Sequence, residues 1–464
     1  MEAIPLPSRL RFSSLRSPTP SLLRRSLSLN ATPFRSRSQC RPLALQRSDH
    51  DVVVVGAGII GLTIARQLLL SSDLSVAIVD AAIPCSGATG AGQGYVWMAH
   101  KTPGSAVWEL GLRSKQMWEE MADGLERDGE DPLDILGWKR TGSLVIGTTS
   151  DELVMLKERV RLFSQAGLRA EYWSSSSLLS EEPALEVGKE SGAVFLPDDC
   201  QIDAARAVDF IQKVNKGFAT EGRYTEFFNN PAIRLLRSER NGEVEAVETS
   251  HNILYGEKAI VIAAGAWSGT LMRSLVVNSP ALPDVPVKPR KGHLLVLENF
   301  NKIQLNHGVM EAGYIGHQVT KIPKASLVSE TIDEHSLPSI SMTATLDSMG
   351  NLVLGSSRQF TGFGTELDES IVQRIWDRAG EFFPSLRVLS HDIKQYKEIR
   401  IGLRPYMPDG KPIIGPFPGL PKVLLATGHE GSGLSLALGT AEMISDMILE
   451  NPLKVDCTPF LYPR

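Results

Sequence analysis

The chain has 464 residues, 42% of them hydrophobic, and a formal net charge of −5 at pH 7. That length and apolar content exclude a small, coreless protein and favour two domains. The acidic balance argues against a nucleic-acid partner. No apolar run approaches the ~20 residues of a membrane-spanning helix, so we expect no transmembrane segment.

Residues 1–48 differ from the rest of the chain in composition. They contain nine Arg, many Ser, no Lys and a single acid, Glu2, which is typical of an organelle transit peptide. The Ser and Pro content favours a plastid (chloroplast), and the Arg content would also suit a mitochondrion. We predict a disordered or cleaved leader, whose loss removes eight net positive charges and leaves a formal charge of −13.

The cysteines do not predict a metal site. Cys40 lies in the predicted leader, and Cys85, Cys200 and Cys457 lack the close spacing of metal-binding cysteines. We expect these three to be ordinary small side chains and the protein to hold no metal.

The first predicted unit of the fold is a strand, a glycine-rich turn, a helix and a second strand. Val52–Val55 precede the sequence Gly56-Ala57-Gly58-Ile59-Ile60-Gly61, and Leu74–Asp80 form the second strand. Such a turn lets backbone approach a pyrophosphate at a helix N-terminus, and an acid such as Asp80 accepts hydrogen bonds from a ribose. The buried strand and the acid about 20 residues after the turn predict a dinucleotide site.

The segment after Asp80 predicts helices and one strand. Helical periodicity covers 105–127 and 151–167, with a strand at Thr141–Thr148 between them. Another helix follows Asp203, a candidate N-cap. Ser86–Gly94 is rich in small residues, which indicates close approach of backbone to a bulky ligand.

Residues 232–395 predict mainly strands. Two alternating segments flank Asn241-Gly242, a type I′ turn signal, and so predict a hairpin. Lys258–Ser268 is nearly continuously apolar, as in a strand buried on both faces. Residues 286–395 predict a mostly antiparallel sheet, interrupted by a polar, irregular stretch at 301–338 that we interpret as a surface excursion or flap.

The C-terminal part of the chain predicts a second strand-turn-helix unit. Val423–Thr427 is strand-like, Gly428–Gly433 is a glycine-rich turn, and Leu434–Leu449 is an apolar helix. A helix N-terminus here would favour negative charge, as develops on a reduced flavin. This feature favours FAD over a nicotinamide, although an ordinary glycine-rich loop is the alternative.

Four motifs in order give the chain a family resemblance. They are Gly-Ala-Gly-Ile-Ile-Gly at 56–61, Ala-Ala-Gly-Ala-Trp-Ser at 263–268, Gly-Leu-Arg-Pro-Tyr-Met-Pro-Asp-Gly-Lys-Pro-Ile-Ile-Gly at 402–415, and the turn at 428–434. The chain resembles the D-amino-acid oxidase superfamily of flavoproteins over everything after residue 50. Within it, the chain looks most like glycine oxidase, bacterial D-amino-acid dehydrogenase and related dehydrogenases.

The resemblance implies an α/β fold with a discontinuous FAD-binding domain and a substrate domain whose mostly antiparallel sheet covers the flavin ring. The FAD-binding domain would comprise 49–110, 190–285 and 396–455, and the substrate domain 111–189 and 286–395. The implied FAD contacts, carried over by position, are Gly56, Ala57, Gly58, Ile59, Ile60, Gly61, Asp80, Ala81, Ala91, Gly92, Gln93, Ala232, Ala264, Gly265, Trp267, Gly428, His429, Glu430, Gly431, Ser432, Gly433 and Leu434.

Arg404 is the implied substrate residue. In relatives with the Gly-Leu-Arg-Pro motif this arginine holds the substrate carboxylate, which a guanidinium binds with two charge-assisted hydrogen bonds. The alternative is an arginine that forms a salt bridge at the domain junction. The implied chemistry is hydride transfer from a neutral amine to flavin N5, which needs no general base and gives an imine that water hydrolyses.

Three other residues are candidates near the substrate. His293 lies on a strand that could face the ring, with a hydrogen-bonded core histidine as the alternative. Tyr406 either lines the pocket or packs beneath it. Thr343 stands where glycine oxidase has a substrate-side tyrosine. We interpret Arg290 and Lys291 as solvated charges at a strand edge.

Departures from the family pattern leave the substrate and the acceptor open. The turn at Gly428 has Glu430 and lacks the second arginine of glycine oxidase, so glycine specificity is not implied. Val353 replaces the oxygen-activating lysine of monomeric sarcosine oxidases, and their FAD-tethering cysteine is missing. We therefore expect non-covalent FAD and either oxygen or a quinone or electron-transfer protein as acceptor.

The function that we expect is oxidation of the C–N bond of a small amino acid or N-alkyl amino acid. The alternative is a flavoprotein that serves as an assembly factor or chaperone of an organellar complex without amino-acid turnover. Arg404 argues against it, because an inactive descendant needs no buried carboxylate clamp.

Overall fold

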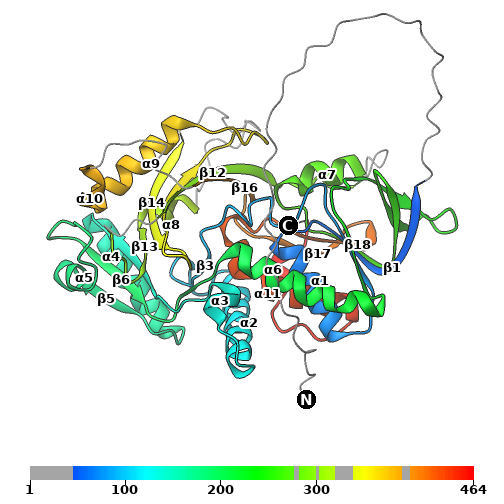
Figure 1. Cartoon of the computed structure of the whole chain (residues 1–464), viewed down its shortest axis with the longest axis horizontal. Helices are drawn as coiled ribbons and strands as arrows, with labels where there is room; N and C mark the ends of the chain where they lie inside the picture. Colours follow the sequence, from blue (N-terminus) through cyan, green and yellow to red (C-terminus); the bar gives the residue numbers. More distant parts are fainter. Residues whose placement is uncertain (1–44, 276–281, 299–302, 319–337, 389–397, 464) are drawn as a thin grey trace, which may run out of the picture. The chain divides into compact units, whose positions relative to one another are not determined.

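A computed structural model describes most of the chain after residue 44. Residues 45–464 form one compact unit, and its two large sheets with their covering helices confirm the predicted α/β class (Figure 1). The predicted leader lies outside the described residues except for residues 45–48. The described ranges are 45–275, 282–298, 303–318, 338–388 and 398–463.

The first sheet has a parallel centre. Its order is β17-β18-β11-β1-β2-β8, and β10 and β9 continue from β11 as an antiparallel extension. The strands are β1 (Gln46–Val55), β2 (Val76–Val79), β8 (Tyr224–Phe227), β9 (Ala232–Arg237), β10 (Val244–Thr249), β11 (Asn252–Ile262), β17 (Ile413–Phe417) and β18 (Leu420–Thr427).

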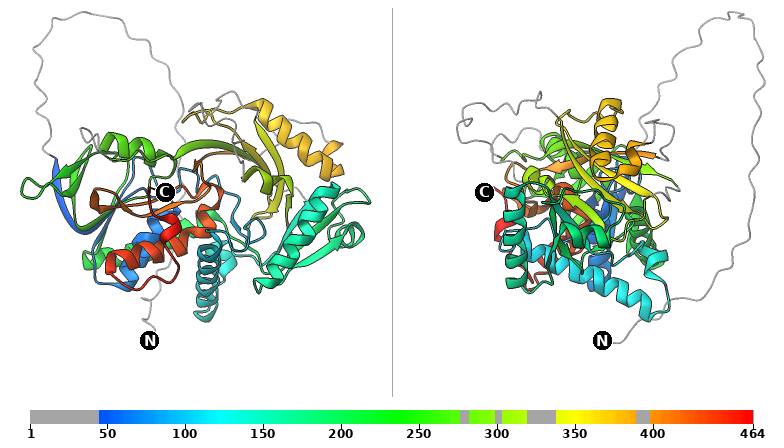
Figure 2. Two further views of the ribbon diagram at one scale, coloured as in Figure 1. Left: turned by 180° about the vertical axis from the view of Figure 1, so that it is seen from behind. Right: turned by 90° about the vertical axis from the view of Figure 1, so that its left-hand side faces the viewer.

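Both faces of this sheet are buried, as its apolar strands predict. Val52 and Val54 pack against α1 and α11, whereas Val53 and Val55 pack against the opposite layer, which includes α7. Figure 2 shows α1 in blue and α11 in red side by side under the sheet. The helices of this half are α1 (Ile59–Ser71), α2 (Trp108–Arg127), α3 (Pro132–Leu136), α6 (Ala204–Gly217), α7 (Ser268–Leu275) and α11 (Gly433–Leu449).

The second sheet is mostly antiparallel, as predicted. Its order is β16-β12-β15-β14-β13-β4-β6-β5, and only the β13–β4 pair is parallel. The strands are β4 (Ser143–Gly147), β5 (Glu171–Ser174), β6 (Gly192–Leu196), β12 (Lys288–Leu297), β13 (Gly308–Glu311), β14 (Ser339–Leu346), β15 (Leu352–Arg358) and β16 (Glu398–Tyr406).

The outer face of the second sheet packs on α9, which runs along it in Figure 1. Ile371 and Ile375 of α9 join Leu295 and Leu354 in one buried cluster. The remaining elements are α4 (Ser150–Gln165), α5 (Ser175–Glu181), α8 (Gly313–Gln318), α9 (Glu369–Phe382), α10 (Pro384–Arg387) and the short pair β3 (Tyr95–Val96) and β7 (Cys200–Gln201).

The division into domains stays a prediction, since residues 45–464 form one compact unit. Most strands lie in the sheet expected for their segment. Four do not: β6 and β16 come from segments assigned to the FAD-binding domain but pair in the second sheet, and β3 and β7 form a separate two-stranded sheet.

Three local predictions are corrected by the structure. The fold begins at Gln46, because residues 46–48 of the predicted leader pair with Asn252–Leu254 of β11. The hairpin forms, but Gly242 alone has a positive φ, of 72°, so its turn is not type I′. Within the predicted excursion, residues 308–311 form β13, a buried interior strand.

Candidate active site

The turn between β1 and α1 has no space for side chains. Gly56 has φ +118°, and a Cβ there would overlap with the carbonyl of Ala263 on the next strand. A Cβ at Gly61 would overlap with the Gly56 carbonyl. Backbone therefore lies directly at the carboxyl ends of β1 and β11, where parallel sheets bind ligands.

The N-terminus of α1 has donors for an anion. Its N-cap, Gly58, makes no side-chain cap, and the first turn holds no acid. Thr89 Oγ1 accepts one amide, from Ile59 at 3.2 Å. Asp80 accepts the amides of Ala57 and Ala82, each at 2.7 Å, and its carboxylate oxygens keep further lone pairs for a ribose.

The second glycine-rich turn brings α11 to the same place. Gly428 has φ +80°, and the non-glycine residue Glu430 also adopts a positive φ, of 48°, which is uncommon and concentrated at functional sites. His429 is buried beneath the turn and shares a 3.0 Å hydrogen bond between Nε2 and Thr440 Oγ1. Burial lowers the pKa of His429 to about 3, so the ring adds no charge at neutral pH.

A cavity of about 490 Å³ joins the two turns. Of the predicted FAD contacts, Gly61, Gly428 and Ser432 lie outside its lining. The predicted residues that line it are Gly56, Ala57, Gly58, Ile59, Ile60, Asp80, Ala81, Ala91, Gly92, Gln93, Ala232, Ala264, Gly265, Trp267, Arg404, His429, Glu430, Gly431, Gly433 and Leu434.

Gln93 connects the cofactor side of the cavity to the second sheet. Its Nε2 donates to the Val353 carbonyl at 3.0 Å and to Thr345 Oγ1 at 3.3 Å. The predicted substrate-side residue Thr343 donates its hydroxyl to Gln93 Oε1 at 2.9 Å and does not line the cavity. Thr343 therefore positions Gln93 in this structure.

Arg404 forms part of the cavity wall on β16. Its guanidinium lies flat over the bare Cα of Gly292 on β12, where any Cβ would overlap with it. Its Nη1 donates to the Ser357 carbonyl at 2.9 Å. Among the described residues the guanidinium makes no salt bridge, so its other donors are available to a ligand.

His293 and Tyr406 do not line the cavity. Side chains alternate along β12, so His293 points away from the face of Gly292 and Leu294, and its Nδ1 lies 3.0 Å from Ser357 Oγ. Burial, Lys291 and Arg404 lower the pKa of His293 to about 4. Tyr406 packs edge-on against Phe360, with ring centroids 5.0 Å apart.

The interpretation of Arg290 and Lys291 as solvated charges is wrong. Their exposed fractions are 4% and 5%, and β12 is an interior strand between β16 and β15 rather than an edge strand. Lys291 donates to the Glu366 carbonyl. Arg290 forms a buried ion pair with Glu430.

The structure adds cavity residues that the sequence reasoning missed. Tyr95 and Tyr314 both line the cavity, and Arg358 lies behind Tyr314, with its guanidinium carbon 4.1 Å from the ring centroid. The small-residue loop before Tyr95 was a usable signal. The sequence contains no such signal for Tyr314 and Arg358, because their segments come together only in the folded second sheet.

The described part of the chain contains neither a metal-ligand cluster nor a disulfide. No cluster of three potential metal-ligating side chains occurs there, and the three cysteines described are free. None of the described helices has both the length and the apolarity that crossing a membrane requires.

The glycine cradle, the uncapped helix and the covering sheet define a dinucleotide-binding α/β protein. The profile of one family, DAO, described as FAD dependent oxidoreductase, matches residues 51–447. The chain belongs to this family and is an FAD-dependent oxidoreductase. The cradle fits FAD: Gly56–Ile60 and Asp80 would hold its ADP part, and the turn at His429–Leu434 would lie at the ring end.

Comparisons with individual proteins support the assignment. Glycine oxidase of Geobacillus kaustophilus is 24% identical over 424 residues, covering 89% of this chain and 97% of that protein. D-amino acid dehydrogenase of Vibrio vulnificus is 24% identical over 324 residues, covering 68% and 67%. The solved structure of the Geobacillus glycine oxidase has a TM-score of 0.73 at 21% identity, covering 90% of this chain and 99% of that one.

A second solved structure shows the same fold. L-proline dehydrogenase from P. horikoshii has a TM-score of 0.72 at 18% identity, covering 90% of this chain and 97% of the other. At 21% and 18% identity, the similarity to these two solved structures concerns the fold alone.

Proposed function

We propose that this protein oxidises the C–N bond of a small amino acid or N-alkyl amino acid with non-covalently held FAD. The observation that carries the proposal is Arg404, a guanidinium in the cavity wall with one backbone acceptor. A carboxylate is the ligand that this planar fork binds best. Relatives named for amino-acid oxidation resemble the chain in sequence, and the Geobacillus glycine oxidase also resembles it in fold.

The protein's own groups position the substrate. Arg404 is held by Ser357 and by the flat surface of Gly292, so little side-chain freedom is lost when a carboxylate binds. Tyr314 and Gly431 lie next to it and restrict the space around the α-carbon. Orientation of this kind supplies much of the rate enhancement when no proton has to be abstracted by a base.

The oxidation removes two electrons from the substrate. When bound, FAD supplies the acceptor for a hydride from the substrate carbon, while the nitrogen loses a proton and the C–N bond becomes an imine. Water then hydrolyses the imine to a carbonyl compound and ammonia or an amine. The electrons pass on to oxygen or to a quinone or electron-transfer protein, and hydrogen peroxide formation distinguishes the two.

The proposal includes a location. The Arg- and Ser-rich composition of residues 1–48 supports import into a plastid, with a mitochondrion as the alternative. A fluorescent protein fused after residue 60 and imaged in plant cells tests this: fluorescence that stays in the cytosol would rule out a targeting leader.

The activity is tested by the visible spectrum of the chain expressed from Leu45. The protein is titrated anaerobically with glycine, sarcosine, proline and D- and L-amino acids. We expect one group of these to bleach the flavin band. Arg404→Met should lower kcat/KM for that group by about a hundredfold, because the charge-assisted hydrogen bonds to the carboxylate contribute roughly 3 kcal/mol.

A matched variant separates carboxylate binding from damage to β16. Arg400→Met removes a guanidinium from the same strand, outside the cavity lining and paired with Glu398 at 2.9 Å, and should leave turnover nearly unchanged. A flavin that no amino acid bleaches would refute the proposal and favour the assembly-factor alternative.

A further inference from the structure

Three arginines lie on three adjacent strands at one end of the cavity, and of these only Arg404 lines it. Arg290 of β12 and Arg404 of β16 are direct cross-strand partners, and Arg358 ends β15, the strand on the other side of β12. Arg290 and Arg358 are only 4% and 6% exposed. Like charges directly opposite each other destabilise a sheet, and more so when buried.

One carboxylate faces this cluster. Glu430 forms its ion pair with Arg290. Burial raises the pKa of Glu430, but Arg290, Arg404 and Arg358 together outweigh burial and hold it below its usual value. Within the described residues, neither Arg358 nor Arg404 forms a salt bridge, so two positive charges lack a counter-ion.

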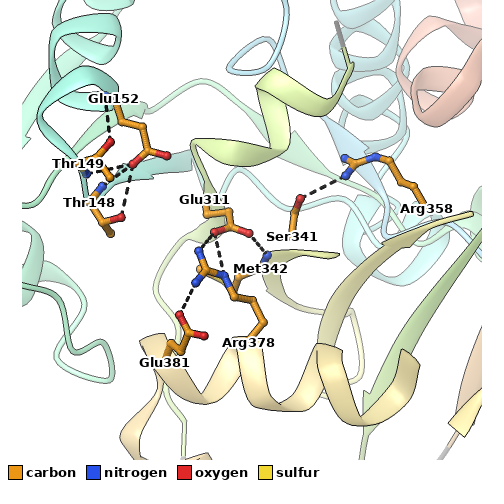
Figure 3. Close-up of polar contacts among 9 residues, drawn as sticks. All are labelled: Thr148, Thr149, Glu152, Glu311, Ser341, Met342, Arg358, Arg378 and Glu381. Atoms are coloured by element: carbon orange, nitrogen blue, oxygen red, sulfur yellow. Dashed lines mark hydrogen bonds and ion pairs between the residues drawn. The ribbon is translucent and has the colours of Figure 1, made fainter. Parts of the chain in front are cut away.

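A further acid of the second sheet, Glu311, is already paired. Glu311 on β13 pairs with Arg378 of α9 and accepts the amide of Met342, and Figure 3 draws no contact between Glu311 and Arg358. Arg358 instead donates Nη1 to Ser341 Oγ at 3.2 Å. Its Nη2 is buried and has no hydrogen-bond partner among the described residues.

Arg358 lies one side chain away from the cavity. Its guanidinium stacks on the ring of Tyr314, and Tyr314 lines the cavity beside Arg404 and Gly431. Burial lowers the pKa of Arg358, and Arg404 and Arg290 lower it further, against the opposing effects of Tyr314 and Glu430. An anion bound on this side would relieve that repulsion.

We propose that the substrate is a dicarboxylic amino acid, with one carboxylate on Arg404 and a second carboxylate selected by the surplus charge of Arg358 on the Tyr314 side of the cavity. This inference rests on the proposed amino-acid oxidation. A monocarboxylic substrate neutralises one of the two uncompensated guanidiniums. A dicarboxylic substrate neutralises both guanidiniums, whereas a substrate with a neutral side chain leaves the buried charge of Arg358 without a counter-ion.

The first test needs no variant. The holoenzyme is assayed with D- and L-aspartate, D- and L-glutamate and N-(carboxymethyl)glycine, each against a partner that lacks only the second charge: asparagine, glutamine and N-(carbamoylmethyl)glycine. We expect kcat/KM to be about 10- to 100-fold higher for the acid than for its amide in one pair, as for a charge-assisted hydrogen bond. Equal values in every pair would overturn the inference.

The second test assigns the selectivity to Arg358. Arg358→Met keeps much of the side-chain volume and should remove the preference for acid over amide, mainly by raising KM for the acid, while turnover of the amide stays within about threefold. Ser341→Ala, which leaves the charge in place and removes its hydrogen-bond partner, is the matched control and should retain the preference. An equal loss for acid and amide in Arg358→Met would mean that the charge acts on the flavin, and would overturn the inference.

The outcomes separate this inference from the proposed function. If monocarboxylic amino acids are oxidised as fast as dicarboxylic ones and Arg404→Met abolishes both, the oxidation stands and the dicarboxylate preference is refuted. If no amino acid reduces the flavin, both fail. Flavin content and melting temperature of each variant establish that it is folded.

Discussion

At the scale of single residues, the face that a polar side chain occupies on the second sheet determines its role. Arg404 and His293 lie on neighbouring strands, yet Arg404 lines the cavity and His293 is buried on the opposite face. The sequence made both residues candidates for contact with the substrate. The alternation of side chains along β12 and β16 separates them.

His293 should make stability depend on pH. Its folded-state pKa is about 4, below the ~6.5 of an unfolded chain, so on acidification the unfolded state takes up the proton first. Stability is therefore complete above pH 6.5 and falls as the pH drops towards 4. In urea unfolding between pH 4.5 and 6, wild type should lose about 1.4 kcal/mol per pH unit more than His293→Gln.

The control for this measurement is His251→Gln. This variant removes an imidazole that is exposed, by the same substitution. Identical slopes for wild type and His293→Gln would show that His293 is not buried in its neutral form.

At the scale of elements, the junction of β1 and α1 depends on contacts that tolerate no added atom. Gly56 and Gly61 bring the strand, the turn and the helix together. The first residues of α1, whose N-cap Gly58 makes no side-chain cap, then line the cavity. The stability of the β1–α1 junction and its affinity for an anion therefore both depend on this close packing.

Gly61→Ala should abolish flavin binding and destabilise the fold. The new Cβ would overlap with the Gly56 carbonyl, and backbone cannot move away without separating α1 from β1, so we expect a cost of about 3 kcal/mol or more. Flavin content after purification and the melting temperature measure both effects.

Gly217→Ala is the comparison for that variant. Gly217 ends α6, and a Cβ there would meet no atom within 4 Å. Alanine has the higher helix propensity, so this change should be neutral or stabilising by up to about 1 kcal/mol. If Gly61→Ala binds flavin as tightly as Gly217→Ala, the close packing at the turn is not required.

At the scale of the whole molecule, the folded unit begins at β1. Gln46–His50 extend β1 along β11, and Arg47 adds a guanidinium 3.9 Å above the ring of Tyr255. The N-terminal boundary of the fold therefore falls a few residues before the end of the leader predicted from composition.

Two truncations should differ in stability. A chain starting at Leu45 keeps all of β1 and should match the full-length protein in melting temperature and flavin content. A chain starting at Asp51 loses five residues of strand pairing, and we expect its melting temperature to fall by several degrees, since about 1 kcal/mol shifts a protein of this size by roughly 2 °C. Equal melting temperatures would contradict a structural role for residues 46–50.

The cofactor end of the site could be predicted from the sequence. Gly56–Gly61 and Asp80 indicate a dinucleotide site by their spacing alone, because a strand, a turn and a helix that follow one another in the chain also lie together in space. The helix after Asp203 was predicted for the same reason, and Asp203 caps it by accepting the amide of Arg206. Local geometry thus defined the α/β class and predicted the glycine turn that lines the cavity.

The substrate end was decided only by tertiary structure. Arg290, Arg358, Arg404 and Glu430 meet because β12, β15 and β16 pair side by side and a distant turn closes against them. A sequence does not show whether a charged residue on a strand is solvated or buried, because this depends on which strands and helices lie beside it. For this reason Arg290 was misassigned and Arg358 was missed. The sequence by itself determined the fold class and predicted a dinucleotide site at the turn between β1 and α1, since both depend on contiguous segments. The charge that faces the substrate depends on sheet register and burial, which only the assembled molecule fixes.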